Sequence, residues 1–333
     1  MTHGESLKRG AACRGVTRFP LKIQKTHKKG TSVRLREAGK VVDTLWYLGR
    51  LESGIYLLDG DDEAMIINGG LSSIVPEILR QFGDFNINED KITKLLILHS
   101  HFDHVGVVPF FKRRHPDLEI YASSRAWKIL GMQNAIDTIN EFSRNVTENM
   151  GMAEACSAYD LEWRNDVSGQ AVSEEDRIAV GDAEVQIIET PGHSSCSIAA
   201  YAPQLKALFP TDSAGIPFKE ILITSGNSNY TQYQESLEKL KDLRTDYICA
   251  DHYGYVTGDE ARNFIARSIE AAREHRAQME ETYRRTGDID TAAHELTTSF
   301  FGEHPDYFLS REIFEAVYRQ MVRHIAKGLE GQT

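Results

Sequence analysis

The chain has 333 residues, 41% of them hydrophobic and 26% charged, which is typical of a folded globular protein and excludes a disordered or fibrous one. Its formal net charge is −11, and because residues 1–40 carry eleven Lys and Arg against two Glu, the remainder is strongly acidic. An acidic body argues against a nucleic-acid partner, and no apolar run approaches the roughly 20 residues that cross a bilayer.

The four cysteines, Cys13, Cys156, Cys196 and Cys249, are widely spaced and form no CxxC pair. No apolar secretory segment precedes them. This pattern favours neither a disulfide framework nor a structural zinc knuckle. We therefore expect a cytoplasmic protein with reduced thiols.

The basic segment 1–40 lacks apolar periodicity and predicts a poorly ordered tail. From residue 41 the sequence pattern changes to short runs rich in β-forming residues, separated by Gly and Asp. This pattern predicts an antiparallel meander. Its strands are expected at 44–49, 54–58 and 63–68. A helix is expected over 72–81, and the apolar run 94–98 predicts a buried strand.

Strand and helix patterns then interleave. Further strands are predicted at 119–122, 183–189, 197–201, 206–209 and 246–250. Residues from about 123 to 170 read as a helical insert between two strands, and residues after 257 become almost wholly helical, with helices over 257–287 and from Ser310. The expected organisation is therefore a tail (1–40), an α/β domain (41–257) that contains the insert, and a helical C-terminal extension (258–333).

The stretch that carries chemistry is His99-Ser-His101-Phe-Asp103-His104, which directly follows the buried strand 94–98. Imidazole and carboxylate groups suit zinc or a similar transition ion. A loop leaving a strand end can direct His99 and His101 to one point and Asp103 with His104 to a second. The spacing therefore predicts two adjacent metal ions.

Further ligands should come from other strand ends. His193 in Thr190-Pro-Gly-His193, Asp212 in Phe209-Pro-Thr-Asp212 and His252 in Ile248-Cys-Ala-Asp-His252 each closely follow an apolar strand. A single histidine in such a place is more often structural than a ligand, but here the six-residue cluster and the order of the three candidates favour metal binding.

In these motifs the chain resembles the metallo-β-lactamase-fold hydrolases over residues 41 to about 257. The resemblance implies an α/β fold in which two sheets form an αββα sandwich with the metals at one edge. It also implies that His99, His101 and His193 hold one divalent metal, that Asp103, His104 and His252 hold the other, and that Asp212 bridges them. Zinc is the default expectation, with iron or manganese as alternatives.

One position departs from the family pattern. Many members have an Asp at the end of the third strand, where this chain has Ile67-Asn68-Gly69-Gly70. An amide still donates and accepts hydrogen bonds, so we expect altered tuning of the metal loop rather than loss of metal.

The resemblance implies a binuclear hydrolase that cleaves a thioester, an ester or a lactone with a hydroxide held between the metals, Asp103 orienting that hydroxide and relaying its proton. The arrangement of insert and C-terminal helices is similar to that of an acyl-CoA thioesterase of the same superfamily. Alternatives are a phosphodiesterase, non-acyl metal chemistry such as hydrolytic dehalogenation or oxidation at iron, and a regulatory binding protein. The expected partner is a small-molecule acyl substrate, and we expect neither a nucleic acid nor a membrane as a partner. The sequence is compatible with a homodimer.

Overall fold

The structure is a computed structural model that describes residues 33–330. The strands are β1 (Val33–Leu35), β2 (Gly39–Val42), β3 (Leu45–Gly49), β4 (Gly54–Asp59), β5 (Ala64–Ile67), β6 (Ile92–Leu96), β7 (Glu119–Ser123), β8 (Gln170–Val172), β9 (Arg177–Val180), β10 (Ala183–Glu189), β11 (Ile198–Ala202), β12 (Ala207–Phe209), β13 (Ile216–Phe218), β14 (Ile221–Ile223), β15 (Tyr247–Cys249) and β16 (Tyr255–Thr257). The α-helices are α1 (Val75–Phe85), α2 (Val108–Arg114), α3 (Ser124–Leu130), α4 (Gln133–Asn149), α5 (Ala153–Cys156), α6 (Tyr230–Leu240), α7 (Gly258–Thr286), α8 (Ile289–Glu303) and α9 (Arg311–Glu330).

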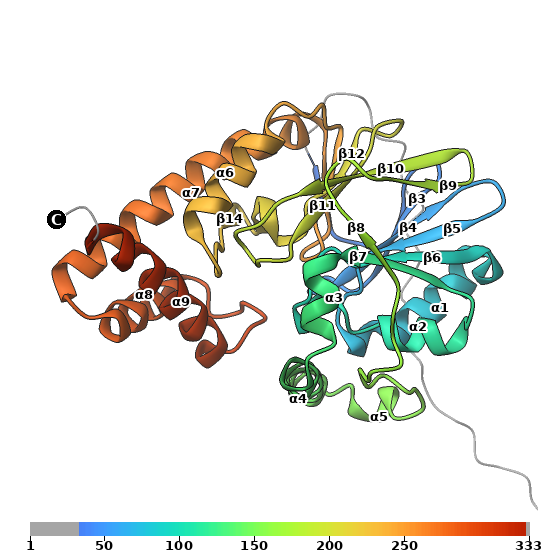
Figure 1. Cartoon of the computed structure of the whole chain (residues 1–333), viewed down its shortest axis with the longest axis horizontal. Coiled ribbons are helices and arrows are strands. Elements are labelled where there is room, and N and C mark those ends of the chain that lie inside the picture. The colour runs from blue at the N-terminus through green and yellow to red at the C-terminus, as the bar shows by residue number, and fades with distance from the viewer. Residues whose placement is uncertain (1–32, 331–333) are drawn as a thin grey trace, which may run out of the picture.

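Two seven-stranded sheets lie face to face at the centre of the molecule (Figure 1). One has the order β2-β3-β4-β5-β6-β7-β8, antiparallel up to β5 and parallel from β5 to β8. The other has the order β1-β16-β15-β12-β11-β10-β9. The expected meander is thus β3, β4 and β5, and the predicted αββα sandwich is confirmed.

Side chains alternate between two cores, as the period of two in a strand requires. In β4, Ile55 and Leu57 pack toward α1 and α2, whereas Tyr56 and Leu58 pack between the sheets. In β11, Ala200 lies between the sheets, and its neighbours pack toward the C-terminal helices. Both faces of each sheet are therefore covered, which explains why the strands read as continuous apolar runs.

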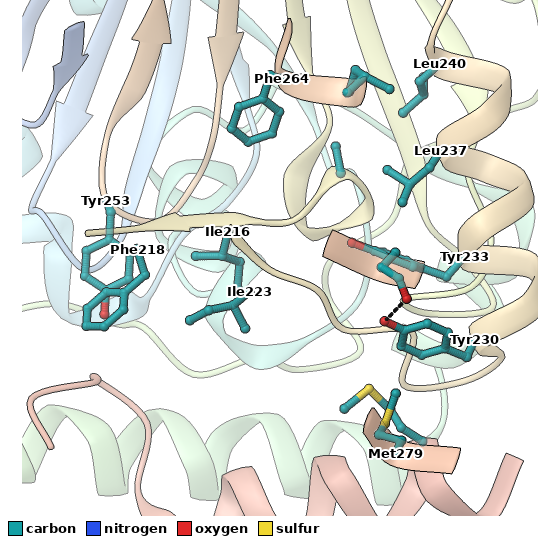
Figure 2. Close-up of a cluster of buried hydrophobic side chains, with 14 of the residues drawn as sticks. Ile216, Phe218, Ile223, Tyr230, Tyr233, Leu237, Leu240, Tyr253, Phe264 and Met279 are labelled. Carbon is teal, nitrogen blue, oxygen red and sulfur yellow. Dashed lines mark hydrogen bonds between the residues drawn. The ribbon is translucent and has the colours of Figure 1, made fainter. Parts of the chain in front are cut away.

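A third core joins the second sheet to helices α6 to α9 (Figure 2). Side chains of α6 and α7 contribute Tyr230, Tyr233, Leu237, Leu240, Phe264 and Met279, all fully buried. Each large apolar side chain buried in this way contributes roughly 1.5–3 kcal/mol. The C-terminal extension is therefore packed onto the sandwich rather than attached to it by a linker.

One expected boundary needs adjusting. Residues 33–40, which we placed in the N-terminal tail, form β1 and the start of β2, because β1 pairs with β16 at the edge of the sheet. Residues 1–32 of that tail lie outside the described part of the chain. The expected helical insert lies between the neighbouring parallel strands β7 and β8 and consists of α3, α4 and α5. Within residues 33–330, no helix is long and apolar enough to cross a membrane.

Candidate metal centre

All seven residues expected to bind metal lie together at one edge of the sandwich. His99, His101, Asp103 and His104 follow β6, where a 3₁₀ turn over Phe102–His104 carries the last two inward. The other three follow strands of the facing sheet: His193 comes after β10, Asp212 after β12 and His252 after β15. Loops from both sheets therefore meet at this edge.

The first group consists of His99, His101 and His193, each of which offers a nitrogen within 4.8 Å of the others. Nε2 of His193 lies 3.0 Å from Nδ1 of His101. Nε2 of His99 is buried and has no hydrogen-bond partner among the described residues. Three imidazole nitrogens directed at one point are suited to a transition-metal ion.

The second group consists of Asp103, His104 and His252. Nε2 of His104 lies 3.2 Å from Nε2 of His252, and Oδ2 of Asp103 lies 3.7 Å and 3.6 Å from these two nitrogens. Asp212 lies between the groups. Its Oδ2 is 3.3 Å from Nε2 of His104 and 3.4 Å from Nε2 of His193, so one carboxylate reaches both groups.

The protonation states favour metal binding by the first group. Burial, reinforced by the neighbouring histidines, lowers the pKa of His99 well below its usual value and that of His101 to about 3. Burial alone would raise the pKa of Asp212, but the adjacent His104, His193 and His252 hold it well below its usual range. At neutral pH His99 and His101 are therefore neutral imidazoles and Asp212 is an ionised carboxylate, and these are the forms that bind a metal.

Contacts behind the ligands fix which nitrogen faces the site. Nδ1 of His193 lies 2.8 Å from the Ser225 carbonyl, and Nδ1 of His252 lies 2.6 Å from the Glu52 carbonyl. Donation from each Nδ1 to these carbonyls leaves Nε2 free to bind metal. The sequence gives no signal for such contacts, because any residue can supply a backbone carbonyl.

Unusual backbone conformations occur next to two of the candidate ligands, Asp212 and His193. Thr211 has φ of +47°, which is unusual for a β-branched residue. Its hydroxyl lies 3.2 Å from Nδ1 of His99. Gly192, next to His193, has φ of +134°, and a Cβ there would lie 2.2 Å from the backbone nitrogen of Tyr233. Only glycine fits there, so α6 can approach the ligand loop.

Behind His104 lie three polar residues, of which Thr211 is the most distant, with its hydroxyl 3.4 Å from Nδ1. Nδ2 of Asn68, the residue that departs from the family pattern, and Oδ2 of Asp251 are each 3.1 Å from Nδ1 of His104. Asp251 was not assigned a role from the sequence. Its position directly before the predicted ligand His252 places it near the centre but does not indicate which ligand it contacts.

A cavity of about 570 Å³ opens directly onto the candidate metal centre. Its walls include Ile139 and Phe142 of α4 and Phe314 and Val317 of α9, so the insert and the C-terminal extension face each other across it. Phe308 stacks on His252 with ring centroids 4.8 Å apart and covers that side. The described residues that line the cavity include neither Lys nor Arg.

A second cavity of about 660 Å³ adjoins the first, since Phe142, Phe308, Leu309 and Ile313 line both. It too has neither Lys nor Arg among its described lining residues, and it carries four acidic residues. These are Glu52, Glu148, Asp306 and Glu312. Together the cavities form a groove with an apolar centre beside the metal centre and an acidic end.

The fold and the cluster of His and Asp side chains define a metal-dependent hydrolase fold with a centre suited to divalent metal. The chain belongs to the metallo-β-lactamase superfamily, whose family model matches residues 48–252. A metallo-β-lactamase fold-containing protein of Sulfurisphaera tokodaii is 23% identical over 205 residues, which are 61% of this chain and 73% of that protein. Ribonuclease J of Mycolicibacterium smegmatis is 33% identical over 92 residues, 27% of this chain and 15% of that protein.

Solved structures share the fold over most of the chain. A β-lactamase domain protein from Burkholderia ambifaria superposes with a TM-score of 0.62 at 15% identity, covering 89% of this chain and 88% of that one. A metallo-β-lactamase family protein from Thermus thermophilus gives a TM-score of 0.61 at 16% identity, covering 87% and 95%. The similarity therefore extends beyond the matched family region into the C-terminal helices.

Proposed function

We propose that the protein is a binuclear metal-dependent hydrolase that cleaves an acyl bond in a thioester, an ester or a lactone. The observation that carries this proposal is the apolar cavity that opens onto the candidate metal centre. A substrate whose acyl group fills that cavity would present its carbonyl carbon to the histidine and aspartate side chains. Apolar pockets with a few convergent polar groups are the usual form of small-molecule sites.

His99, His101 and His193 would hold one ion, Asp103, His104 and His252 the other, and Asp212 would contact both. Two divalent cations bound there supply hydroxide at neutral pH and polarise the scissile carbonyl. The nitrogen and oxygen donors suit zinc first, and iron or manganese also.

The chain's own residues orient the reactants and move the proton. Asp103 lines the cavity, where its carboxylate can accept the proton of the attacking nucleophile and pass it to the leaving group. Phe308 and Phe142 line the cavity, where they would exclude water from the space above a bound carbonyl. A thiolate leaving group, with a thiol pKa of about 8.5, needs little help from an acid, so a thioester is an easy substrate for such a site.

The charge of the groove supports an uncharged acyl substrate over a phosphodiester. A nuclease site needs Lys and Arg side chains to neutralise the phosphates that flank the scissile one, and the described lining residues of both cavities include neither. The stretch similar to ribonuclease J covers 15% of that enzyme, too little to carry its activity over. Dehalogenation and oxidation at iron would use the same donors, so the metal content has to be measured alongside activity.

Within the superfamily, the insert, the turn Asn68-Gly-Gly-Leu-Ser72 and the segment Glu303-His-Pro-Asp-Tyr-Phe-Leu309 resemble the quinolone signal response protein, a 2-aminobenzoylacetyl-CoA thioesterase. This resemblance is the reason to include acyl-CoA thioesters in the test. The nucleotide of coenzyme A would have to lie outside the groove, because the groove has no cationic lining among the described residues.

The test is metal analysis of the purified protein together with hydrolysis of acyl-CoA thioesters, uncharged thioesters and esters, lactones and a phosphodiester, before and after chelation. We expect about two metals per chain and acyl hydrolysis that disappears on chelation and returns with metal. Two metals without acyl turnover would reject the acyl substrate, and no metal would reject the centre itself.

A further inference from the structure

The two nitrogens of His104 face different surroundings. Nε2 lies 3.3 Å from Oδ2 of Asp212 and 3.2 Å from Nε2 of His252, inside the candidate metal centre. Nδ1 faces away and lies 3.1 Å from both Oδ2 of Asp251 and Nδ2 of Asn68. His104 and Asn68 are fully buried, and Asp251 is 2% exposed, so water does not compete for these contacts.

The amide and carboxylate contacts at Nδ1 require opposite tautomers, whereas the Thr211 hydroxyl, 3.4 Å from Nδ1, can donate or accept and so favours neither. A neutral imidazole carries one proton, an amide NH₂ can only donate, and a carboxylate can only accept. Donation from Asn68 to Nδ1 therefore requires the ring proton to be on Nε2, where it blocks metal binding. Donation from Nδ1 to Asp251 leaves Nε2 with a free lone pair for the metal.

We propose that Asp251 is a positioning residue that holds His104 in the metal-binding tautomer, and that Asn68 favours the other tautomer. The balance between a carboxylate and an amide behind one ligand then sets the affinity of the half of the centre formed by Asp103, His104 and His252. The inference rests on the proposed metal centre and assigns a role that the ligand set alone does not contain.

The surroundings of Asp251 fit this role. Its backbone carbonyl accepts a hydrogen bond of 2.8 Å from Gly54, and the Tyr56 hydroxyl donates at 2.6 Å to the carbonyl of Ala250. The loop is thus fixed from β4. Oδ1 of Asp251 has no hydrogen-bond partner among the described residues, so the contact with His104 is its main side-chain interaction.

Asn68 can be exchanged for Asp without disturbing the backbone. Its φ of +68° lies in the left-handed region, which Asn and Asp both tolerate. Its backbone nitrogen donates to the carbonyl of Leu96 at 2.9 Å, a contact that does not depend on the side chain. The carboxylate can therefore be moved from one side of Nδ1 to the other by two substitutions.

The experiment compares Asp251→Asn with the double exchange Asn68→Asp/Asp251→Asn, using competition with a chromophoric zinc chelator to measure both zinc affinities. We expect Asp251→Asn to lower the affinity for one of the two zinc ions by about 10–100-fold. In the double variant this affinity should recover to within about threefold of that of the unmodified protein. Asp242→Asn, at an exposed position, serves as the matched control. Circular dichroism of the metal-free proteins checks that each is folded.

Each outcome of this experiment either supports or overturns the proposed role of Asp251. Unchanged zinc affinity in Asp251→Asn would overturn the proposal, and so would a double variant as weak as the single one, because the position of the carboxylate would then not matter. If Asp251→Asn does not fold, recovery of both fold and zinc affinity in the double variant supports the proposal, and failure to recover overturns it. An unmodified protein that binds no zinc, iron or manganese would instead reject the proposed function.

Discussion

The hydroxyl of Thr224 lies 2.9 Å from Nδ1 of His275, and Ser225, the next residue in the chain, contacts Nδ1 of His193. Nε2 of His275 lies 3.1 Å from the hydroxyl of Tyr318. One half-buried histidine on α7 therefore joins α9 to the loop that supports a candidate metal ligand, so the C-terminal helices are linked to the centre through this series of contacts.

This contact predicts a pH dependence of stability. Burial lowers the pKa of His275 to about 4, so the unfolded chain binds its proton before the folded one does. The free energy of unfolding is therefore highest above about pH 6.5. It falls by about 3 kcal/mol in total as pH falls toward about 4, because the unfolded chain then binds a proton that the folded chain does not. Urea unfolding of the metal-free protein should therefore depend less on pH in His275→Gln than in the unmodified protein. Equal pH slopes would contradict the prediction, and Tyr318→Phe, which keeps the histidine, should retain the slope.

Removing single ligands should distinguish the two halves of the centre. We expect His101→Ala and His252→Ala each to lose about one metal per chain, and Asp212→Ala, whose carboxylate contacts both groups, to weaken both. Metal analysis after dialysis measures the content, and acyl hydrolysis should fall in all three. His294→Ala, on the exposed face of α8, is the control. Two retained metals in Asp212→Ala would exclude a shared ligand at this position.

Filling the apolar cavity should discriminate among substrates by size. Val317 on α9 lines the cavity, so Val317→Trp should raise KM for long acyl esters by about tenfold or more while an acetyl ester changes by about threefold or less. Arg323→Trp adds the same side chain at an exposed position of the same helix. A uniform loss for all esters in Val317→Trp would point to misfolding or damage to the centre rather than to an acyl pocket.

The acidic end of the groove should select against negative charge. With acyl group and leaving-group size matched, we expect neutral esters to be hydrolysed with a kcat/KM about tenfold above that of anionic ones, at low salt. Glu148→Lys and Glu312→Lys should reduce this preference, whereas Glu303→Lys, outside the groove, should not. An unmodified enzyme that prefers anionic esters would refute the charge argument without affecting the metal assignment.

Much of the architecture could be predicted from the sequence because the relevant signals are local. The run Leu95–Leu98 followed by three histidines and an aspartate indicates both a buried strand and the chemistry at its end. The order of His193, Asp212 and His252 after later strands indicates that loops of the second sheet meet the first. The structure brings these seven side chains together where the motif order led us to expect them.

The remainder depends on long-range contacts. β1 is only three residues long and is stabilised by pairing with β16, more than 200 residues away in the chain, so no local pattern distinguishes it from a basic tail. The hairpin of β13 and β14 was not predicted either, and α8 lies in the extension expected to be helical but was not predicted as a separate helix. Asp251 was missed because its role depends on which nitrogen of His104 it meets, and sequence spacing does not encode that geometry.

The cavity wall built by α4 and α9 lies on segments that are separate from the loops of the metal centre. Substitutions in those two helices can reshape the cavity while the ligand geometry stays as it is. The chain thus separates what it can bind from how it reacts, so related proteins can diverge in substrate while keeping one catalytic apparatus, and directed evolution of this one should begin with α4 and α9.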